Sequence, residues 1–377
     1  MAPGADRFLE GFPVPVDPEA IEHELVRLWR PDVSAKDSPS VTRVCLSNLI
    51  VHLPDEAARE AASRLLPAIA RRHPSRIFVL VHRARGAGDP RLSASIAAIC
   101  HRPEPGGASV CCEEIILEAP PGDEGQFPGA VLPLLVPDVP TTLVAIFPGG
   151  KRLVGSLSGF ADRIVVDSRR DGGDVLASLA SSFGRPGVAV GDLAWEATLP
   201  WRRVFADLFD EPEVRALAAS LRRMEAAYRP GDEPGEPRAP GARGSGLAPA
   251  ALLAGWLGSR LGLELAAGEE DRRAGGASEV VLRPAGAGEA PAVEIASFRL
   301  VSEDGELSVA ADPRGFSVRF DTRKACVLPR RVPGRPEDDV SLLGRALERI
   351  PDPEVFAGAA RAALRILGRD GAEGREP

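Results

Sequence analysis

The chain has 377 residues, enough to bury a substantial core and to form two domains. Its formal net charge of −8 at pH 7 argues against general binding to nucleic acids or anionic membranes, because both require a basic face. The five cysteines lie mostly inside apolar segments, which is typical of a reduced cytoplasmic protein rather than of a disulfide framework.

The N-terminal region shows no targeting signal. Residues 1–17 are rich in glycine and proline, are expected to be loose, and lack the basic start and apolar centre of a signal peptide. No apolar run approaches the ~18 residues of a membrane helix. The sequence therefore predicts a soluble, cytoplasmic protein.

Residues 18–185 are expected to form an N-terminal α/β domain. Apolar residues at helical spacing predict helices at residues 18–30, 55–72 and 174–183. Buried strands are expected at residues 41–53, 76–81, 92–100, 110–117, 141–147 and 163–167, with the third and fourth forming a hairpin. This alternation predicts a mixed, mostly parallel sheet flanked by helices.

Residues 186–228 are expected to be connecting helices. Asp192 suits a helix N-cap, and a stripe through Trp201 and Phe205 has helical spacing, although Pro200 is expected to kink that helix. A second helical stripe covers residues 213–228. Residues 229–246, half proline and glycine, predict a linker.

The last third of the chain predicts a second, α+β domain at residues 247–368, followed by a tail at residues 369–377. A helix is expected at residues 249–263, and helices at residues 341–349 and 353–367 close the domain. Between them, short runs with alternating apolar residues predict an antiparallel sheet with one solvent-facing side. These strands are expected at residues 280–283, 293–300, 306–310, 316–320 and 324–328.

Motifs of common catalytic and cofactor sites are missing from the sequence. It has no dinucleotide-binding glycine fingerprint, no phosphate-binding loop and no His-Glu-x-x-His pair. The Gly-Ser-Leu-Ser-Gly run at residues 155–159 does not fit a nucleophile elbow. Cys100, His101 and Cys111 could meet across the hairpin as zinc ligands, but buried cysteines more often act as small apolar groups. No cofactor is expected.

His52 and His82 both end predicted strands, at the edge where open α/β sheets generally bind ligands. If the two strands are neighbours, the rings could flank a pocket and act as acid and base on a ligand such as a sugar phosphate. The simpler interpretation is two polar strand ends near solvent, which is favoured because no nucleophile or carboxylate pair accompanies them.

Several stretches, taken in order, carry a family resemblance. They are the helix at residues 21–29, the Arg-His-Pro-Ser-Arg run at residues 72–76, the leucine- and proline-rich residues 132–140, residues 191–195 followed by Trp201 and Arg202, and residues 255–261. With these motifs the chain resembles the OpcA family of glucose-6-phosphate dehydrogenase assembly proteins across about residues 18–263. It departs from the family pattern in two places. The family tends to carry tryptophan at the positions of residues 144–148, and its helix after Trp195 is usually not interrupted by a proline such as Pro200.

The resemblance implies a non-catalytic protein that binds glucose-6-phosphate dehydrogenase and favours its active oligomer, acting as an allosteric activator in the oxidative pentose phosphate pathway. No nucleic acid or membrane partner is implied. Tryptophan and arginine are common anchors of protein interfaces. The expected partner contacts are therefore His73, Arg76, Trp195, Trp201 and Arg202, although the same motif residues also suit core positions, and residues 73–76 also suit a structural turn.

Overall fold

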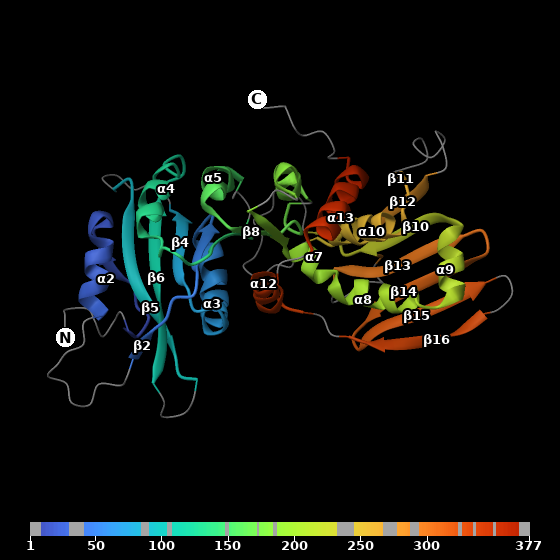
Figure 1. Cartoon of the computed structure of the whole chain (residues 1–377), viewed down its shortest axis with the longest axis horizontal. Coiled ribbons are helices and arrows are strands. Elements are labelled where there is room, and N and C mark those ends of the chain that lie inside the picture. Colours follow the sequence, from blue (N-terminus) through green and yellow to red (C-terminus); the bar gives the residue numbers. More distant parts are fainter. Residues whose placement is uncertain are drawn as a thin grey trace. The chain divides into compact units, whose positions relative to one another are not determined.

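The computed structural model describes residues 9–29, 41–83, 90–103, 108–147, 151–171, 173–183, 187–231, 245–266, 277–286, 294–322, 326–334, 337–349 and 352–368 (Figure 1). The chain forms two compact units, and the main division between them falls between Val165 and Val166. The domain boundaries expected from the sequence stay predictions. Most of the expected linker and the whole expected tail lie outside the described residues.

The first unit is built on a mostly parallel sheet with the strand order β1-β5-β6-β4-β3-β7-β8, and β2 lies beside the start of β6. Strands β3, β4, β6 and β7 are parallel to one another, whereas β5 is antiparallel to both β1 and β6. The strands are β1 (Val14–Val16), β2 (Val41–Arg43), β3 (Asn48–Leu53), β4 (Arg76–His82), β5 (Ser93–His101), β6 (Ser109–Ala119), β7 (Thr141–Ala145) and β8 (Arg163–Val166). The predicted mixed α/β sheet is confirmed.

Helices accompany this sheet, as the apolar stripes predict. Asp55 accepts a hydrogen bond from the backbone N–H of Ala58 and so caps α3, whose buried residues repeat at helical spacing. The helices of the unit are α2 (Ile21–Trp29), α3 (Glu56–Arg72), α4 (Gln126–Val131) and α5 (Lys151–Leu157), with 3₁₀ turns η1 (Pro18–Ala20), η2 (Leu132–Leu134) and η3 (Ser158–Phe160).

The single strand expected at residues 41–53 is wrong. The chain forms β2 and β3 there, and the two strands lie in different places, β2 beside β6 and β3 between β4 and β7. Between them the backbone N–H of Leu46 donates to the carbonyl of Pro74, so the segment turns along the sheet edge. The polar pair Ser47 and Asn48 lies at this break, but the apolar residues on both sides of it favour one continuous strand.

The second unit contains a seven-stranded sheet with the order β11-β12-β10-β13-β14-β15-β16. From β10 through β13, β14 and β15 to β16, each strand is antiparallel to the next, whereas β12 is parallel to both β10 and β11. The strands are β10 (Leu221–Tyr228), β11 (Leu265–Ala266), β12 (Ser278–Pro284), β13 (Ile295–Ser302), β14 (Gly305–Asp312), β15 (Gly315–Thr322) and β16 (Cys326–Pro333), and a further strand, β9 (Ala189–Asp192), precedes α7. The predicted α+β fold with an antiparallel sheet is confirmed.

One face of this second sheet carries the core of the unit. Phe298 and Leu300, two residues apart on β13, are fully buried, while Arg299 between them binds Glu306 on the other face. Helix α10 packs on β10 and β12, and α13 packs on α10 (Figure 1). The helices are α6 (Asp174–Ser178), α7 (Leu193–Ala197), α8 (Leu199–Leu208), α9 (Pro212–Ala219), α10 (Leu247–Leu261), α12 (Asp339–Glu348) and α13 (Pro353–Ile366), with a 3₁₀ turn η4 (Ala180–Ser182).

Part of the expected helix at residues 213–228 is wrong. Helix α9 ends at Ala219, and the following residues form β10 between β12 and β13. Leu221 and Met224 fit a helical stripe, but a three-residue spacing between two apolar residues is too short to establish a period, and pairing with two strands decides the conformation. The helix around Pro200 is also divided at Thr198, which places the proline in the first turn of α8, where its missing N–H costs little.

The cysteines differ from the expectation of a fully reduced chain. Cys100 and Cys111 face each other across β5 and β6 and form a disulfide, with Cα atoms 4.1 Å apart. The pair therefore cannot serve as zinc ligands with His101 in this state. Cys45 and Cys112 carry free thiols, and burial raises the pKa of Cys112 to about 11.

No described helix is both long and apolar enough to span a bilayer.

Candidate functional site

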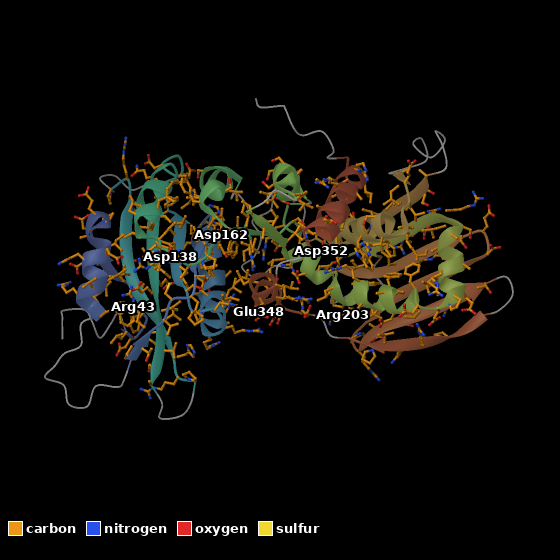
Figure 2. The ribbon with its side chains drawn as sticks, viewed as in Figure 1. Arg43, Asp138, Asp162, Arg203, Glu348 and Asp352 are labelled. Atoms are coloured by element: carbon orange, nitrogen blue, oxygen red, sulfur yellow. A yellow bond between two sulfur atoms is a disulfide. The ribbon has the colours of Figure 1, made fainter. Side chains whose placement is uncertain are left out.

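A buried charge network lies at the amino end of β4. Arg76 is 4 % exposed, and its Nε donates to Oε2 of Glu113 at 2.8 Å. Glu113 is 2 % exposed and also accepts from the indole of Trp29 at 2.7 Å and pairs with Arg43, labelled in Figure 2, at 2.8 Å. Burial acts to lower the pKa of Arg76, but Glu113 and Glu22 together hold it above its usual value. The network thus joins α2, β2, β4 and β6 through one carboxylate.

Arg76 also holds the leucine- and proline-rich loop at residues 132–140. Its Nη1 donates to the carbonyl of Leu134 at 2.6 Å. The buried amide of Asn48 holds the same loop from β3, since its Nδ2 donates to the carbonyl of Val136 at 3.0 Å and its Oδ1 accepts from the N–H of Val136 at 2.9 Å. Two motifs that are distant in sequence are therefore joined by direct hydrogen bonds.

His73 ends α3. Its backbone N–H donates to the carbonyl of Ile69 at 2.8 Å, and its side chain is half-buried. Its own carbonyl accepts from Ser75, whose hydroxyl lies 2.8 Å from that of Ser47. The predicted structural turn between a helix and the strand that follows is confirmed.

The motif residues of the second unit form an aromatic and cationic cluster. The guanidinium of Arg202 lies 3.6 Å from the centroid of the Trp195 ring, and its Nε donates to Thr198 at 3.0 Å. Burial lowers the pKa of Arg202 to about 10, against the opposite effect of nearby Glu196. Trp195 is 2 % exposed and packs edge-on against Phe356 of α13. This cluster ties α7 and α8 to the C-terminal helix.

Trp201 is 3 % exposed and packs against Phe316, with ring centroids 4.9 Å apart. Both rings line a pocket whose wall also carries the carboxylates of Glu294, Asp312 and Glu337. Arg169 binds Glu294, and Arg345 binds Glu337, so these two charges are already paired. The pocket therefore presents little free charge to a ligand.

Of the five expected partner contacts, Arg76, Trp195 and Trp201 are buried, and His73 and Arg202 are half-buried. The structure brings Trp195 and Arg202 into contact with each other and gives each of the five a structural role. Their contact with a partner stays a prediction.

His52 and His82 meet at the carboxyl end of β3 and β4. These strands are parallel neighbours, and the two Nε2 atoms lie 3.0 Å apart. One Nε2 must donate and the other accept, so the contact requires at least one neutral ring. Glu124, which the sequence did not associate with the pair, lies 3.7 Å from Nδ1 of His82. His52 is 1 % exposed, and its Nδ1 has no hydrogen-bond partner among the described residues.

Burial favours the neutral form of both His52 and His82. Burial, and then the neighbouring His82, lower the pKa of His52 to about 4, although Glu124 acts in the opposite direction. Burial also lowers the pKa of His82, again against Glu124. Within the described ranges, no group of three or more His, Cys, Asp or Glu side chains is placed to hold a metal ion.

Two family models match the chain, and both are described as domains of a "Glucose-6-phosphate dehydrogenase subunit". Residues 66–181 match the model of the N-terminal domain, and residues 188–360 match the model of the C-terminal domain. The chain belongs to the OpcA family of glucose-6-phosphate dehydrogenase assembly proteins. No curated protein sequence matches it significantly.

Solved structures of dehydrogenases have a weak likeness to the chain. UDP-N-acetylglucosamine 3-dehydrogenase GnnA from Acidithiobacillus ferrooxidans is 10% identical with a TM-score of 0.38, and the match covers 86% of this chain and 97% of that one. A dehydrogenase from Chromobacterium violaceum is 11% identical with a TM-score of 0.37, covering 86% and 96%. Scores this low support no conclusion about activity or ligands.

The motifs that carry the OpcA resemblance have clear structural roles. Asp192 caps α7 through the N–H of Ala194 and also accepts from both the N–H and the hydroxyl of Ser168. Burial raises the pKa of Asp192 to about 7, against the effect of these hydrogen bonds. In the run at residues 255–261, Gly255 lies so close to α13 that an added Cβ would be 2.4 Å from the carbonyl oxygen of Ala359.

Sequence reasoning missed the residues that complete both sites in the first unit. Glu113 could have been noticed as a charged residue inside the apolar run at residues 110–117, since buried charges are rare unless paired. Glu124 and Asn48 carried no comparable signal, because their partners are far away in the sequence.

Proposed function

We propose that this chain is a non-catalytic assembly factor of the cytoplasm that binds glucose-6-phosphate dehydrogenase and favours its active oligomer. The supporting observation is the match of both family models, in order, over most of the chain. The lack of common catalytic motifs in the sequence agrees with a protein that acts through its partner. In this proposal it is an allosteric activator of the oxidative pentose phosphate pathway.

Such an activator shifts an equilibrium between states of its partner. It can shift it only by the difference between its affinities for the two states, and each tenfold change needs about 1.4 kcal/mol. A tenfold activation by population shift therefore requires only one or two good contacts that form in the active oligomer and not in the other state.

The test is a titration of the purified chain into glucose-6-phosphate dehydrogenase of the same organism. Initial rates are measured over a range of substrate concentrations while light scattering after size-exclusion chromatography gives the mass of the complex. We expect a saturable rise in rate together with a larger complex. A complex without any change in rate would support a purely structural scaffold, and no complex at all would refute the proposal.

A second candidate function is the binding of a sugar phosphate at the carboxyl edge of the first unit. The observation that favours it is the contact between His52 and His82, together with the buried Nδ1 of His52, for which the described residues provide no hydrogen-bond partner. Ligands of open α/β sheets bind at this edge. Glucose 6-phosphate at 100 times its dissociation constant should stabilise the chain by about 2.7 kcal/mol, which a melting curve detects easily. An unchanged melting temperature at millimolar ligand would reject this candidate.

A further inference from the structure

Four loops meet at the amino edge of the parallel strands in the first unit, at residues 44–47, 73–75, 132–140 and 158–162. Backbone hydrogen bonds hold them together. Leu46 donates to Pro74, Asn48 donates to Pro140, and Asp162, just before β8, donates to Thr141 at the start of β7. We call these four loops the amino-edge surface.

The amino-edge surface exposes large apolar side chains. Leu46 is 62% exposed and Phe160 is 54% exposed, and they lead into β3 and β8, which are separated only by β7. At the usual strand spacing these two strands are about 10 Å apart. Three prolines of the loop at residues 132–140 are exposed as well: Pro133, Pro137 and Pro140. Single exposed apolar residues are ordinary, whereas a group of them on one edge is typical of an interaction site.

Buried polar groups hold this surface in one conformation. Arg76 binds the carbonyl of Leu134 from below, Asn48 binds both backbone groups of Val136, and Oδ2 of Asp162 accepts from the N–H of Thr141 at 2.7 Å. Loops that are already ordered lose little conformational entropy when they bind. The buried Arg76 therefore helps to hold the surface in position.

Two carboxylates flank the apolar groups. Asp138 and Asp162, both labelled in Figure 2, are exposed, and neither forms an ion pair within the described parts of the chain. Asp138 has a φ of 62°, which turns the backbone sharply at the surface. A face that complements this one carries an apolar pocket bordered by lysine or arginine.

We propose that the amino-edge surface is where this chain docks on glucose-6-phosphate dehydrogenase, with Phe160 and Leu46 as apolar anchors and Asp138 facing a basic group of the enzyme. This inference rests on the proposed function and assigns its interface. Three of the four loops lie inside residues 66–181, the segment matched by the N-terminal of the two family models, which are named for the dehydrogenase. This match is the reason to choose the enzyme over a second copy of the chain.

The dimensions suit the centre of an interface. The loops precede the four neighbouring strands β4, β3, β7 and β8, which span about 14 Å. A standard interface buries about 800 Å² on each partner, which corresponds to a patch about 28 Å across. The amino-edge surface therefore provides the apolar core of the contact, where most of the binding energy is usually found.

The test compares matched variants of the full chain in binding to the dehydrogenase, measured by biolayer interferometry. Phe160→Ser and Leu46→Ser are combined in one variant, and Phe12→Ser is the control. Phe12 is 53% exposed in the same unit but precedes β1, at the opposite end of the strand order. We expect the double variant to bind at least about 30-fold more weakly and the control to bind within twofold of the wild type.

A second variant, Asp138→Asn, tests the charge. Asparagine tolerates the positive φ, so this change removes the charge and keeps the turn. We expect association with the dehydrogenase to slow severalfold at low salt and to depend less on ionic strength, with little change in dissociation. If the salt dependence is unchanged, Asp138 does not face a basic group of the dehydrogenase, and that part of the proposal is wrong.

The outcomes separate the two proposals. If the wild-type chain forms no complex, the proposed function and this surface both fail. If the wild type binds and the double variant binds equally well, or if the Phe12 control loses as much affinity, the surface is wrong and the proposed function stands. Should the double variant unfold, amide hydrogen exchange of the wild type decides. Protection of residues 132–140 by the dehydrogenase supports the surface, and no protection there overturns it.

Discussion

Replacing Arg76 by methionine removes the central cation of the buried network in the first unit. Methionine keeps an unbranched apolar stem of similar length, so the change removes charge and hydrogen bonds while adding little strain. With the guanidinium, the protein loses the hydrogen bond to Glu113 at 2.8 Å and the one to the carbonyl of Leu134 at 2.6 Å. Glu113, 2 % exposed, is left with Arg43 and the indole of Trp29.

Removing one partner of a buried ion pair typically costs 3–5 kcal/mol, because the other charge is left uncompensated. Glu113 keeps two partners, the indole of Trp29 and the 42% exposed Arg43, so we expect a loss of stability at the lower end of this range. We expect the free energy of unfolding of the first unit to fall by about 3 kcal/mol. For a unit of this size, that corresponds to roughly 6–12 °C in melting temperature.

Urea denaturation followed by circular dichroism and tryptophan fluorescence measures this loss, with Trp29 reporting on the network itself. The control is Arg27→Met in the same unit, where the ion pair with Glu24 is 42% exposed on the arginine side. We expect that control to cost less than about 1 kcal/mol.

The double variant Arg76→Met/Glu113→Leu tests the mechanism, since replacing both charges by apolar groups is often neutral. It should recover part of the stability that Arg76→Met loses. If Arg76→Met costs no more than the Arg27→Met control, or if the double variant adds the full cost of both changes, the network does not hold the unit together as argued.

Two further predictions concern other elements. His52 has a folded pKa of about 4 against 6.5 when unfolded, so the unfolded state takes up the proton first and stability falls as pH drops through this window. Pulse proteolysis at pH 7 and pH 4.5 should show a loss of about 2 kcal/mol in the wild type and a smaller loss in His52→Gln. An equal loss in both proteins would contradict this prediction. Gly255→Ala places a Cβ against the backbone of α13 and should destabilise the second unit by about 1–3 kcal/mol. The matched change Gly358→Ala meets only Ser259 at 3.6 Å and should be neutral or stabilising, and calorimetry that ranks the two variants the other way would refute the packing argument.

Local patterns were sufficient where one element decides its own structure. The stripe of α3 and its cap at Asp55, the hairpin of β5 and β6, and the alternation of Phe316, Val318 and Phe320 all have the conformation that the sequence predicts. In each case the repeat is several residues long and a turn or capping residue limits it, so neighbours in the sequence carry enough information.

Local sequence patterns gave the wrong conformation where pairing between distant segments determines the secondary structure. Residues 221–228 form a strand because β12 and β13 lie on either side, and residues 41–53 divide because β2 and β3 pair with different strands. The sequence could place Cys100 and Cys111 near each other across the hairpin, but the disulfide between them requires the direct pairing that the register of β5 against β6 provides.

Hydrophobic periodicity was enough to predict the fold class of both units, and the order of the motifs was enough to predict the family. The sequence could not separate core from surface among the motif residues, because tryptophan and arginine serve both purposes. The folded structure separates them, because it buries Arg76 and Trp195 among partners from distant segments and brings Leu46 and Phe160 to one exposed edge. Burial and exposure depend on which elements pack together, and that is a property of the folded chain rather than of any one stretch.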